Sequence, residues 1–149
     1  MEKAYFPMFV DISHKKIVVA GGGRIAARRV ETLGLFASDI TVVAPDICAK
    51  LRDMGEKICL VHRRFEARDI EDADIVLAAA NDHELNESIV NLCRKKGILV
   101  NTADDKERCD FYFPGIVQKG EITIGLNSGG KNPEKVKNVR KRIEELPDI

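Results

Sequence analysis

Three glycines and an alanine stand at a spacing that can bind phosphate. An apolar run at residues 17–20 leads directly into Gly21, Gly22 and Gly23, and Ala26 follows. In the pattern Gly-x-Gly-x-x-Ala, the first glycine permits a tight turn and the second lets a pyrophosphate approach the backbone. The small third residue lets a helix pack close to the preceding strand. We therefore predict a dinucleotide site here, with a glycine turn that only packs as the alternative.

A carboxylate follows the second apolar run of the chain. Residues 40–44 form this run, and Pro45 and Asp46 end it. In a dinucleotide-binding unit, an acidic residue near the tip of the second strand holds the ribose 2′-hydroxyl of the adenosine, which excludes a 2′-phosphate. This position favours NAD over NADP. The alternative is that Asp46 is the N-cap of a helix at residues 47–54.

A second carboxylate, Asp104, follows a later apolar run at residues 98–100. A carboxylate at such a position can accept the proton that accompanies a hydride transfer. Asp105 is adjacent, and two neighbouring acids next to Asn101 and Thr102 are also typical of a solvated turn. The residues themselves leave both interpretations open.

Strands alternating with helices must position these residues. Apolar side chains at helical spacing follow the glycine turn as far as Gly34 and recur from Leu85 to Cys93, before Gly97. The pattern predicts an α/β fold, a Rossmann-like doubly wound parallel sheet whose strand ends share one rim. The predicted strands are residues 17–20, 40–44, 58–61, 75–79 and 98–100.

The pattern changes after Cys109. Two short apolar runs surround Lys119 and Gly120, which predicts a hairpin appended to the sheet. Residues 131–142 then form a short helical tail with six basic residues and one acidic residue. The tail is either a solvated helix face or a cationic wall for a polyanionic substrate. We divide the chain into an NAD-binding Rossmann domain at residues 1–113 and an appended region at residues 114–149.

The beginning of the chain is a lead-in segment rather than a central strand. Pro7 lies within an apolar stretch, which suits the edge of a sheet. Phe6, Met8 and Val10 alternate with other residues, so we expect one side of this segment to pack on the domain.

Composition excludes several classes of function. The 24 basic and 24 acidic side chains of the 149 residues cancel, so the whole molecule has no charge that favours nucleic acid or an anionic membrane. No apolar run approaches the roughly 20 residues that span a bilayer, and no signal peptide is recognisable, which predicts a cytoplasmic protein. The four cysteines lack the spacing of a zinc site or a disulfide framework, so we expect free, mostly buried thiols and no metal site.

Taken together, seven segments resemble the precorrin-2 dehydrogenase family, the N-terminal module of siroheme synthases. They are ordered as in that family: FPMFVDI, VVAGGGRIAARRV, TVVAP, DIVLAAANDHELN, ILVNTADD, CDFYFPGIV and ITIGLNSGG. The resemblance implies oxidation of precorrin-2 to sirohydrochlorin with NAD, in a homodimer, and leaves iron insertion open. Members of the family commonly continue with further helices that help to close the substrate site and the dimer. Residues 114–149 are therefore expected to be a shortened form of that region.

The resemblance also implies roles for individual residues. Asp104 matches the aspartate that the family uses in catalysis. Precorrin-2 carries several carboxylates, so its site needs basic side chains or backbone N–H groups. Residues expected to bind NAD are Gly21, Gly22, Gly23, Arg24, Ile25, Pro45, Asp46, Ala80 and Asn81. Residues expected to bind the substrate are Arg28, Ser128, Gly129, Gly130 and Lys131, although Ser128 and the two glycines that follow it suit the end of a hairpin equally well.

Two departures from the family pattern keep other functions open. Asn81 stands where the family usually has Thr, and Asn132 precedes Pro133 where the family has Ser. The main alternative is an NAD-binding sensor or regulatory module without catalysis, and a further one is a non-catalytic assembly partner. The FPMFVDI and CDFYFPGIV segments argue against the sensor, which has no need of them.

Overall fold

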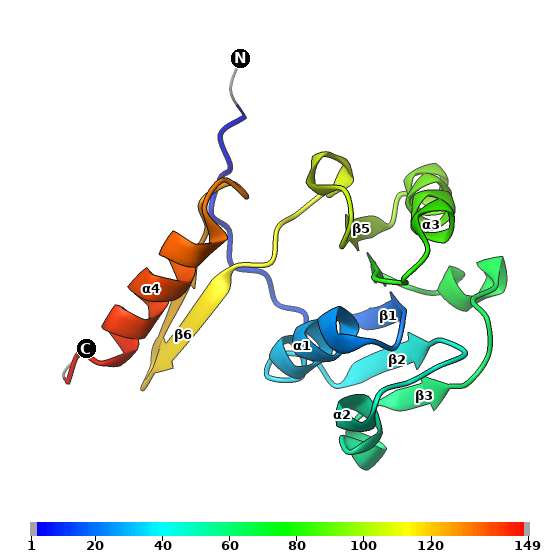
Figure 1. Ribbon diagram of the computed structural model, residues 1–149, viewed down its shortest axis with the longest axis horizontal. Helices are drawn as coiled ribbons and strands as arrows, with labels where there is room; N and C mark the ends of the chain where they lie inside the picture. Colours follow the sequence, from blue (N-terminus) through cyan, green and yellow to red (C-terminus); the bar gives the residue numbers. More distant parts are fainter. Residues whose placement is uncertain (1–2, 148–149) are drawn as a thin grey trace. The chain divides into compact units, whose positions relative to one another are not determined.

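The computed structural model describes residues 3–147 and contains two compact units. The first unit is Val10–Phe111, and the second combines residues 3–9 with residues 112–147 (Figure 1). Residues 3–9 therefore group with the C-terminal segment rather than with the sheet. The predicted assignment of cofactor binding to residues 1–113 and of other roles to residues 114–149 stays a prediction.

The first unit is built on a parallel sheet of five strands, which confirms the predicted fold. Their order in space is β3-β2-β1-β4-β5, so the chain moves from β1 to one side of the sheet and later returns to the other. Ligands of such sheets bind outside the carboxyl ends of the strands where the direction reverses, here β1 and β4. The strands are β1 (Lys16–Ala20), β2 (Asp39–Val43), β3 (Cys59–Val61), β4 (Ile75–Ala78) and β5 (Leu99–Thr102).

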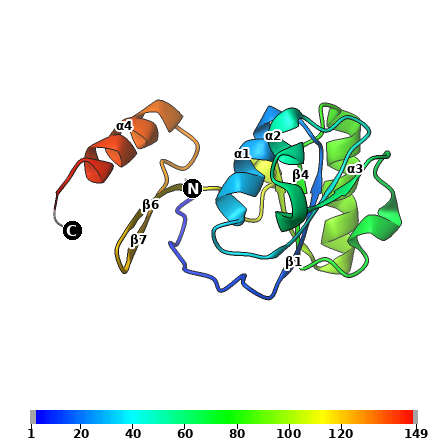
Figure 2. The same ribbon diagram turned by 90° about the horizontal axis from the view of Figure 1, so that it is seen from below.

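Helices cover both faces of this sheet (Figure 2). Helices α1 (Arg24–Leu33) and α2 (Ala49–Arg52) contact each other on one face. Helix α3 (His83–Lys96) and the 3₁₀ helix η2 (Ala67–Ile70) lie together on the opposite face. Two further 3₁₀ helices, η1 (Gly55–Lys57) and η3 (Lys106–Arg108), lie in the connections before β3 and after β5.

The central strands β1 and β4 are apolar at every position after Lys16, the first residue of β1, because both of their faces are covered. In β1, residues 17–20 are at most 1% exposed. Alternate residues face opposite layers: Val18 and Ala20 pack in one cluster with Ile89 and Cys93 of α3. Each fully buried Val, Leu or Ile side chain stabilises the fold by about 1.5–3 kcal/mol. This burial holds the carboxyl ends of β1 and β4 rigidly side by side.

The second unit is an antiparallel hairpin and a helix. Strands β6 (Gly115–Lys119) and β7 (Ile122–Leu126) pair with each other, and α4 (Pro133–Glu144) contacts β6. The side chain of Asn132 caps α4 by accepting the N–H of Lys135 at 2.9 Å. The predicted hairpin and helical tail are confirmed.

The expectation that one side of the lead-in segment packs on the domain is wrong. Phe6, Met8 and Val10 are 86%, 72% and 56% exposed, and Phe9 between them is 78% exposed. Residues 3–12 form no strand, because no neighbouring strand of the described chain pairs with them. Tyr5 has a partner in its own unit: its hydroxyl donates to that of Tyr112 at 2.8 Å, and the ring centroids are 4.5 Å apart.

Among the described helices, none combines the length and the apolar character that are needed to cross a bilayer.

Candidate cofactor and catalytic site

The three glycines of the turn after β1 meet three different surroundings. Gly21 has φ +125°, and a Cβ there would lie 2.2 Å from the carbonyl oxygen of Ala79, after β4. A Cβ on Gly22 would lie 2.3 Å from the carbonyl oxygen of Asp46, after β2. A Cβ on Gly23 would meet no atom within 4 Å. Gly21 and Gly22 therefore let three strand ends meet, whereas Gly23 borders open space.

Helix α1 begins at that open space. Gly23 is its N-cap residue and has extended backbone angles, and it offers no side chain to cap the helix. Ala26 is fully buried, which lets α1 lie close to the sheet, while Arg24 and Ile25 are exposed. Because the N-terminal N–H groups and the helix dipole attract anions, this end of α1 fits the pyrophosphate of a dinucleotide.

The loop after β2 lies against the same turn. The N–H of Cys48 donates to the carbonyl oxygen of Gly22 at 2.8 Å, and Pro45 and Asp46 are exposed. Helix α2 begins at Ala49 with Cys48 as its N-cap residue, so the alternative that Asp46 is the N-cap of a helix is wrong. The Asp46 side chain is thus not used in capping, and its contact with a ribose stays a prediction.

A buried asparagine that sequence reasoning missed joins two of the predicted site loops. Asn86 is 1% exposed. Its Oδ1 accepts the N–H of Ala80 at 3.0 Å, and its Nδ2 donates to the carbonyl oxygen of Ala80 at 2.9 Å and to Oδ2 of Asp104 at 3.0 Å. Asn86 lies on the buried face of α3, three residues before Ile89. A polar residue at such a position needs hydrogen-bond partners, and this was the feature of the sequence that could have indicated its role.

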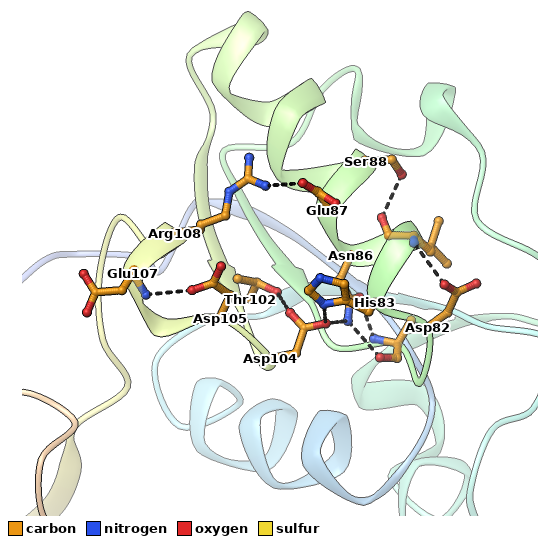
Figure 3. A network of polar contacts seen from close by, with 12 residues as sticks. Asp82, His83, Asn86, Glu87, Ser88, Thr102, Asp104, Asp105, Glu107 and Arg108 are labelled. Atoms are coloured by element: carbon orange, nitrogen blue, oxygen red, sulfur yellow. Dashed lines mark hydrogen bonds and ion pairs between the residues drawn. The ribbon is translucent and has the colours of Figure 1, made fainter.

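Asp104 lies at the centre of a hydrogen-bond network (Figure 3). Thr102 Oγ1 donates to Oδ1 of Asp104 at 2.7 Å, and Nδ1 of His83 lies 2.9 Å from Oδ2. Burial by itself raises the pKa of Asp104, but hydrogen bonds from Asn86, Thr102 and His83 together hold that pKa below its ordinary value of 3.8. The carboxylate is therefore ionised and tied to both β5 and α3.

The neighbouring acid points elsewhere. Oδ1 of Asp105 accepts the N–H of Glu107 at 3.1 Å, so Asp105 is the N-cap residue of η3 (Figure 3). The interpretation of the two residues as a solvated turn stays open, because Asp104 is exposed and Asp105 caps a local 3₁₀ helix. Asp105 has a local capping role, whereas Asp104 joins residues from two elements of the sheet unit.

The family of the chain can be read from comparison with known proteins. Residues 8–115 match a family described as "Putative NAD(P)-binding". This match spans well over half of the chain. The chain belongs to this NAD(P)-binding family.

Two curated relatives and one solved structure point to the same group of proteins. The chain is 41% identical over 144 residues to the "Probable multifunctional siroheme biosynthesis protein HemA" of Ruminiclostridium josui, and 35% identical over 144 residues to the "Siroheme synthase" of Blochmanniella pennsylvanica (strain BPEN). These alignments cover 95% of the chain but only 28% and 30% of the relatives. A solved structure named "SirC, precorrin-2 dehydrogenase" has the same fold, with a TM-score of 0.79 at 21% identity, and covers 93% of this chain and 69% of that one. The resemblance to siroheme synthases that the motifs indicated is confirmed.

Membership of the NAD(P)-binding family fits the geometry of the first unit. The predicted cofactor residues from Gly21 to Ile25 and from Pro45 to Asp46 lie on adjoining loops, because Gly22 contacts the loop after β2. Ala80 and Asn81 follow β4, beside the same turn, and Asn81 is exposed. The individual contacts with the cofactor stay predictions.

The predicted substrate residues are divided between the two units. Arg28 is exposed on α1, whereas Ser128, Gly129, Gly130 and Lys131 form the connection from β7 to α4. Several N–H groups of this connection are used within it: that of Gly129 donates to Asn127 Oδ1, that of Lys131 to Ser128 O, and that of Asn132 to Ser128 Oγ. The loop is thus a defined turn before α4, and its contact with substrate stays a prediction.

The cysteines are free, and residues 3–147 contain no group of three or more His, Cys, Asp or Glu side chains that could hold a metal ion. Cys93 is buried in the core, and this burial raises the pKa of its thiol to about 11. Cys48 and Cys109 are half-buried and Cys59 is exposed, so the expectation of mostly buried thiols is wrong.

Proposed function

We propose that this protein oxidises precorrin-2 to sirohydrochlorin with NAD. One observation carries the proposal: the glycine turn that fits a pyrophosphate and the ionised Asp104 belong to loops that Ala79, Ala80 and Asn86 join directly. The name of the structural neighbour includes this substrate, and the names of the relatives refer to siroheme biosynthesis. A module that only sensed NAD would not need an ionised carboxylate held by three donors at its rim.

The residues of the first unit would hold NAD in one orientation. The N-terminus of α1 and the open side of Gly23 would receive the pyrophosphate, and Asp46 would accept a hydrogen bond from the ribose 2′-hydroxyl. Asn86 fixes the backbone of Ala80 on the nicotinamide side. When bound, NAD supplies the hydride acceptor, and the protein supplies orientation and a place for the proton.

We also propose that the protein works as a homodimer. A two-stranded sheet needs a further packing surface to be stable, and although α4 contacts β6, the hairpin of the second unit has a single buried apolar side chain among its described residues, Val117. Phe6, Met8 and Phe9 of the same unit are exposed. A second copy of the chain would cover these side chains and stabilise the hairpin.

Three further inferences complete this proposal. The predicted substrate residues Arg28 and Ser128–Lys131 would bind carboxylates of precorrin-2, since cations and backbone N–H groups bind such groups. The balanced charge of the chain argues against nucleic acid as a partner. We propose a cytoplasmic location, in line with the biosynthetic role of the relatives.

The test is an assay with both substrates. The purified full chain is incubated with precorrin-2 and NAD, and the absorbance of sirohydrochlorin and of NADH is recorded. We expect both to increase together in equal amounts. Binding of NAD without formation of either product would instead identify a sensor or an assembly partner.

A further inference from the structure

We infer that His83 accepts the proton that leaves precorrin-2, through its Nε2, and that Asp104 is the positioning residue that orients its ring. This inference rests on the proposed function and assigns the proton to a histidine instead of the carboxylate. It starts from the contact between His83 Nδ1 and Asp104 Oδ2, at 2.9 Å.

Both oxygens of Asp104 are already occupied. Oδ1 accepts the hydroxyl of Thr102 at 2.7 Å, and Oδ2 accepts the amide of Asn86 at 3.0 Å in addition to its contact with His83. Three donors stabilise the ionised form of a carboxylate, and accordingly the pKa of Asp104 is lowered from its ordinary value. A carboxylate held in this way is a weak base at neutral pH, and taking a proton would require it to lose a donor.

The contact with Asp104 determines where the neutral ring of His83 carries its proton. An ionised carboxylate can only accept, so Nδ1 donates to Oδ2 and the remaining lone pair of the ring lies at Nε2. His83 is the first residue of α3, and its side chain is 68% exposed. Nε2 can therefore reach a substrate, whereas the side chain of Asp104 is 31% exposed and lies beside the ring, in contact with Nδ1 (Figure 3).

A chain of short contacts connects His83 to the predicted cofactor turn. Asp104 accepts a hydrogen bond from Asn86, and the Asn86 side chain also forms hydrogen bonds with both the N–H and the carbonyl oxygen of Ala80. Ala80 follows Ala79, whose carbonyl lies against Gly21. The imidazole thus belongs to the same rigid rim as the turn that would bind the pyrophosphate.

The proton balance of the reaction requires such a group. One C–H bond of precorrin-2 breaks, and its electron pair leaves with the hydrogen as a hydride to NAD. A second bond to hydrogen breaks, its electron pair remains in the new double bond, and the proton forms an N–H bond at Nε2 of His83. The imidazolium then releases this proton to water from its exposed side, so His83 returns to its neutral form.

The charges that face His83 determine the pH range of this step. Asp104, in the loop after β5, contacts His83 directly, and the more distant charges of Asp105 in the same loop and of Glu87 on the next turn of α3 act on it without contact. The hydrogen bond with Asp104 is the main cause that raises the pKa of His83 above its ordinary value of 6.5. Because the neutral ring is the base, kcat/KM should increase as the pH rises through this raised pKa. If Asp104 were the base, kcat/KM would have no such inflection near neutral pH.

The kinetic test compares His83→Gln with the wild-type chain. Glutamine can still donate a hydrogen bond to Asp104 but cannot accept a proton at neutral pH. We expect kcat to fall about 10²-fold or more, the range of general-base catalysis, with loss of the inflection and an unchanged Kd for NAD. His14→Gln, at an exposed histidine before β1, is the matched control and should retain the wild-type profile.

The variant Asp104→Asn tests whether Asp104 orients the ring of His83. The amide can donate to Nδ1, which would move the ring proton to Nε2 and remove the lone pair that accepts the substrate proton. NMR titration of His83 should show a pKa above 6.5 and a protonated Nδ1 in the wild-type chain, and a lower pKa in Asp104→Asn. The same His83 pKa in both chains would overturn the pairing, even if the enzyme were inactive.

The possible failures can be distinguished. If the wild-type chain turns over precorrin-2 and the kcat of His83→Gln is within about threefold of the wild-type value, His83 is not the base, because loss of a base should lower kcat about 10²-fold. The proposed function would remain intact in that case. No sirohydrochlorin from the wild-type chain overturns the proposed function and, with it, the proton step that rests on it.

Discussion

Gly21 lies so close to the carbonyl group of Ala79 that a Cβ on Gly21 would be 2.2 Å from its oxygen. The two residues follow β1 and β4, the strands between which the direction of the sheet reverses. Their contact packs the loops after β1 and β4 against each other at the predicted cofactor site. The glycines of this turn therefore differ: Gly21 and Gly22 are needed for close packing of the backbone, whereas Gly23 is not.

Gly21→Ala should therefore destabilise the protein. Alanine must adopt φ +125° and displace the backbone of Ala79, and both effects raise the free energy of the folded state. The strained backbone conformation alone should decrease the free energy of unfolding by about 1–3 kcal/mol, and the displacement of the Ala79 backbone adds to this decrease. Denaturant unfolding followed by circular dichroism measures this change, and an unchanged midpoint would contradict the packing of the turn.

Gly23→Val should abolish NAD binding without unfolding the chain. The valine side chain would extend into the space beside Gly23 where no protein atom lies within 4 Å, and where the pyrophosphate must approach. Isothermal calorimetry should show micromolar-range NAD binding for the wild-type chain and no binding for the variant. If the variant still binds NAD, the pyrophosphate does not lie at Gly23.

Asp46 should make the site prefer NAD to NADP. A carboxylate accepts the ribose 2′-hydroxyl but repels a 2′-phosphate. We expect NADP to bind more weakly than NAD, and Asp46→Asn to bring the two dissociation constants closer together. Equal or tighter binding of NADP by the wild-type chain would show that Asp46 does not contact the ribose.

Asp104→Asn should lower kcat by about 10²-fold or more, because it removes the charge that orients and supports the base. The affinity for NAD should hardly change. Asp105→Asn is the matched control, since an asparagine caps η3 as well as an aspartate does, and it should remain active. If both variants lose activity alike, the difference in orientation between the two carboxylates has no part in catalysis.

Asp69 should make stability depend on pH in the acid range. Its carboxylate pairs with both terminal nitrogens of Arg63, at 2.9 and 2.5 Å, and its pKa is lowered chiefly by this hydrogen bonding. A lowered pKa in the folded state stabilises the protein above the ordinary value of 3.8, and the contribution is lost as the pH falls through the folded-state pKa.

We therefore expect Asp69→Asn to lower the Tm by roughly 4 °C or more at pH 7. The difference from the wild-type chain should become smaller below pH 3.8, where Asp69 is protonated in the unfolded state. Calorimetry of both chains across this range is the measurement, with Asp72→Asn, at an exposed position, as control. A difference that is independent of pH would show that the ion pair is not its cause.

Much of the first unit could be predicted because its signals are local. A strand buried on both faces must be apolar throughout, as residues 17–20 are, and a helix that covers a sheet must repeat its apolar residues at a spacing of three to four. Gly34 and Gly97 end α1 and α3 as expected. The predicted strands differ from the observed ones by a residue or two at their ends, where hydrogen bonding to neighbours decides.

The lead-in segment shows where a local signal fails. Alternation of Phe6, Met8 and Val10 indicated a face that packs, yet these side chains are exposed in the described chain. A pattern of apolar residues indicates that a surface packs against another surface, but it does not identify which surface that is. For the same reason the pattern does not reveal whether a second copy of the chain covers this segment.

The sequence by itself determined the parallel sheet, the glycine turn and the presence of a carboxylate after the fifth strand, because periodicity and spacing specify them within a few residues. The tertiary structure alone decided which of two adjacent acids faces the rim, that Asn86 joins Ala80 to Asp104, and that His83 lies 2.9 Å from the carboxylate. These contacts join residues of α3 to the loops after β4 and β5, so they depend on the packing of the helix against the sheet. Hydrogen bonds between side chains of different elements leave no periodic trace in the sequence, and only the folded arrangement shows which donors a carboxylate has.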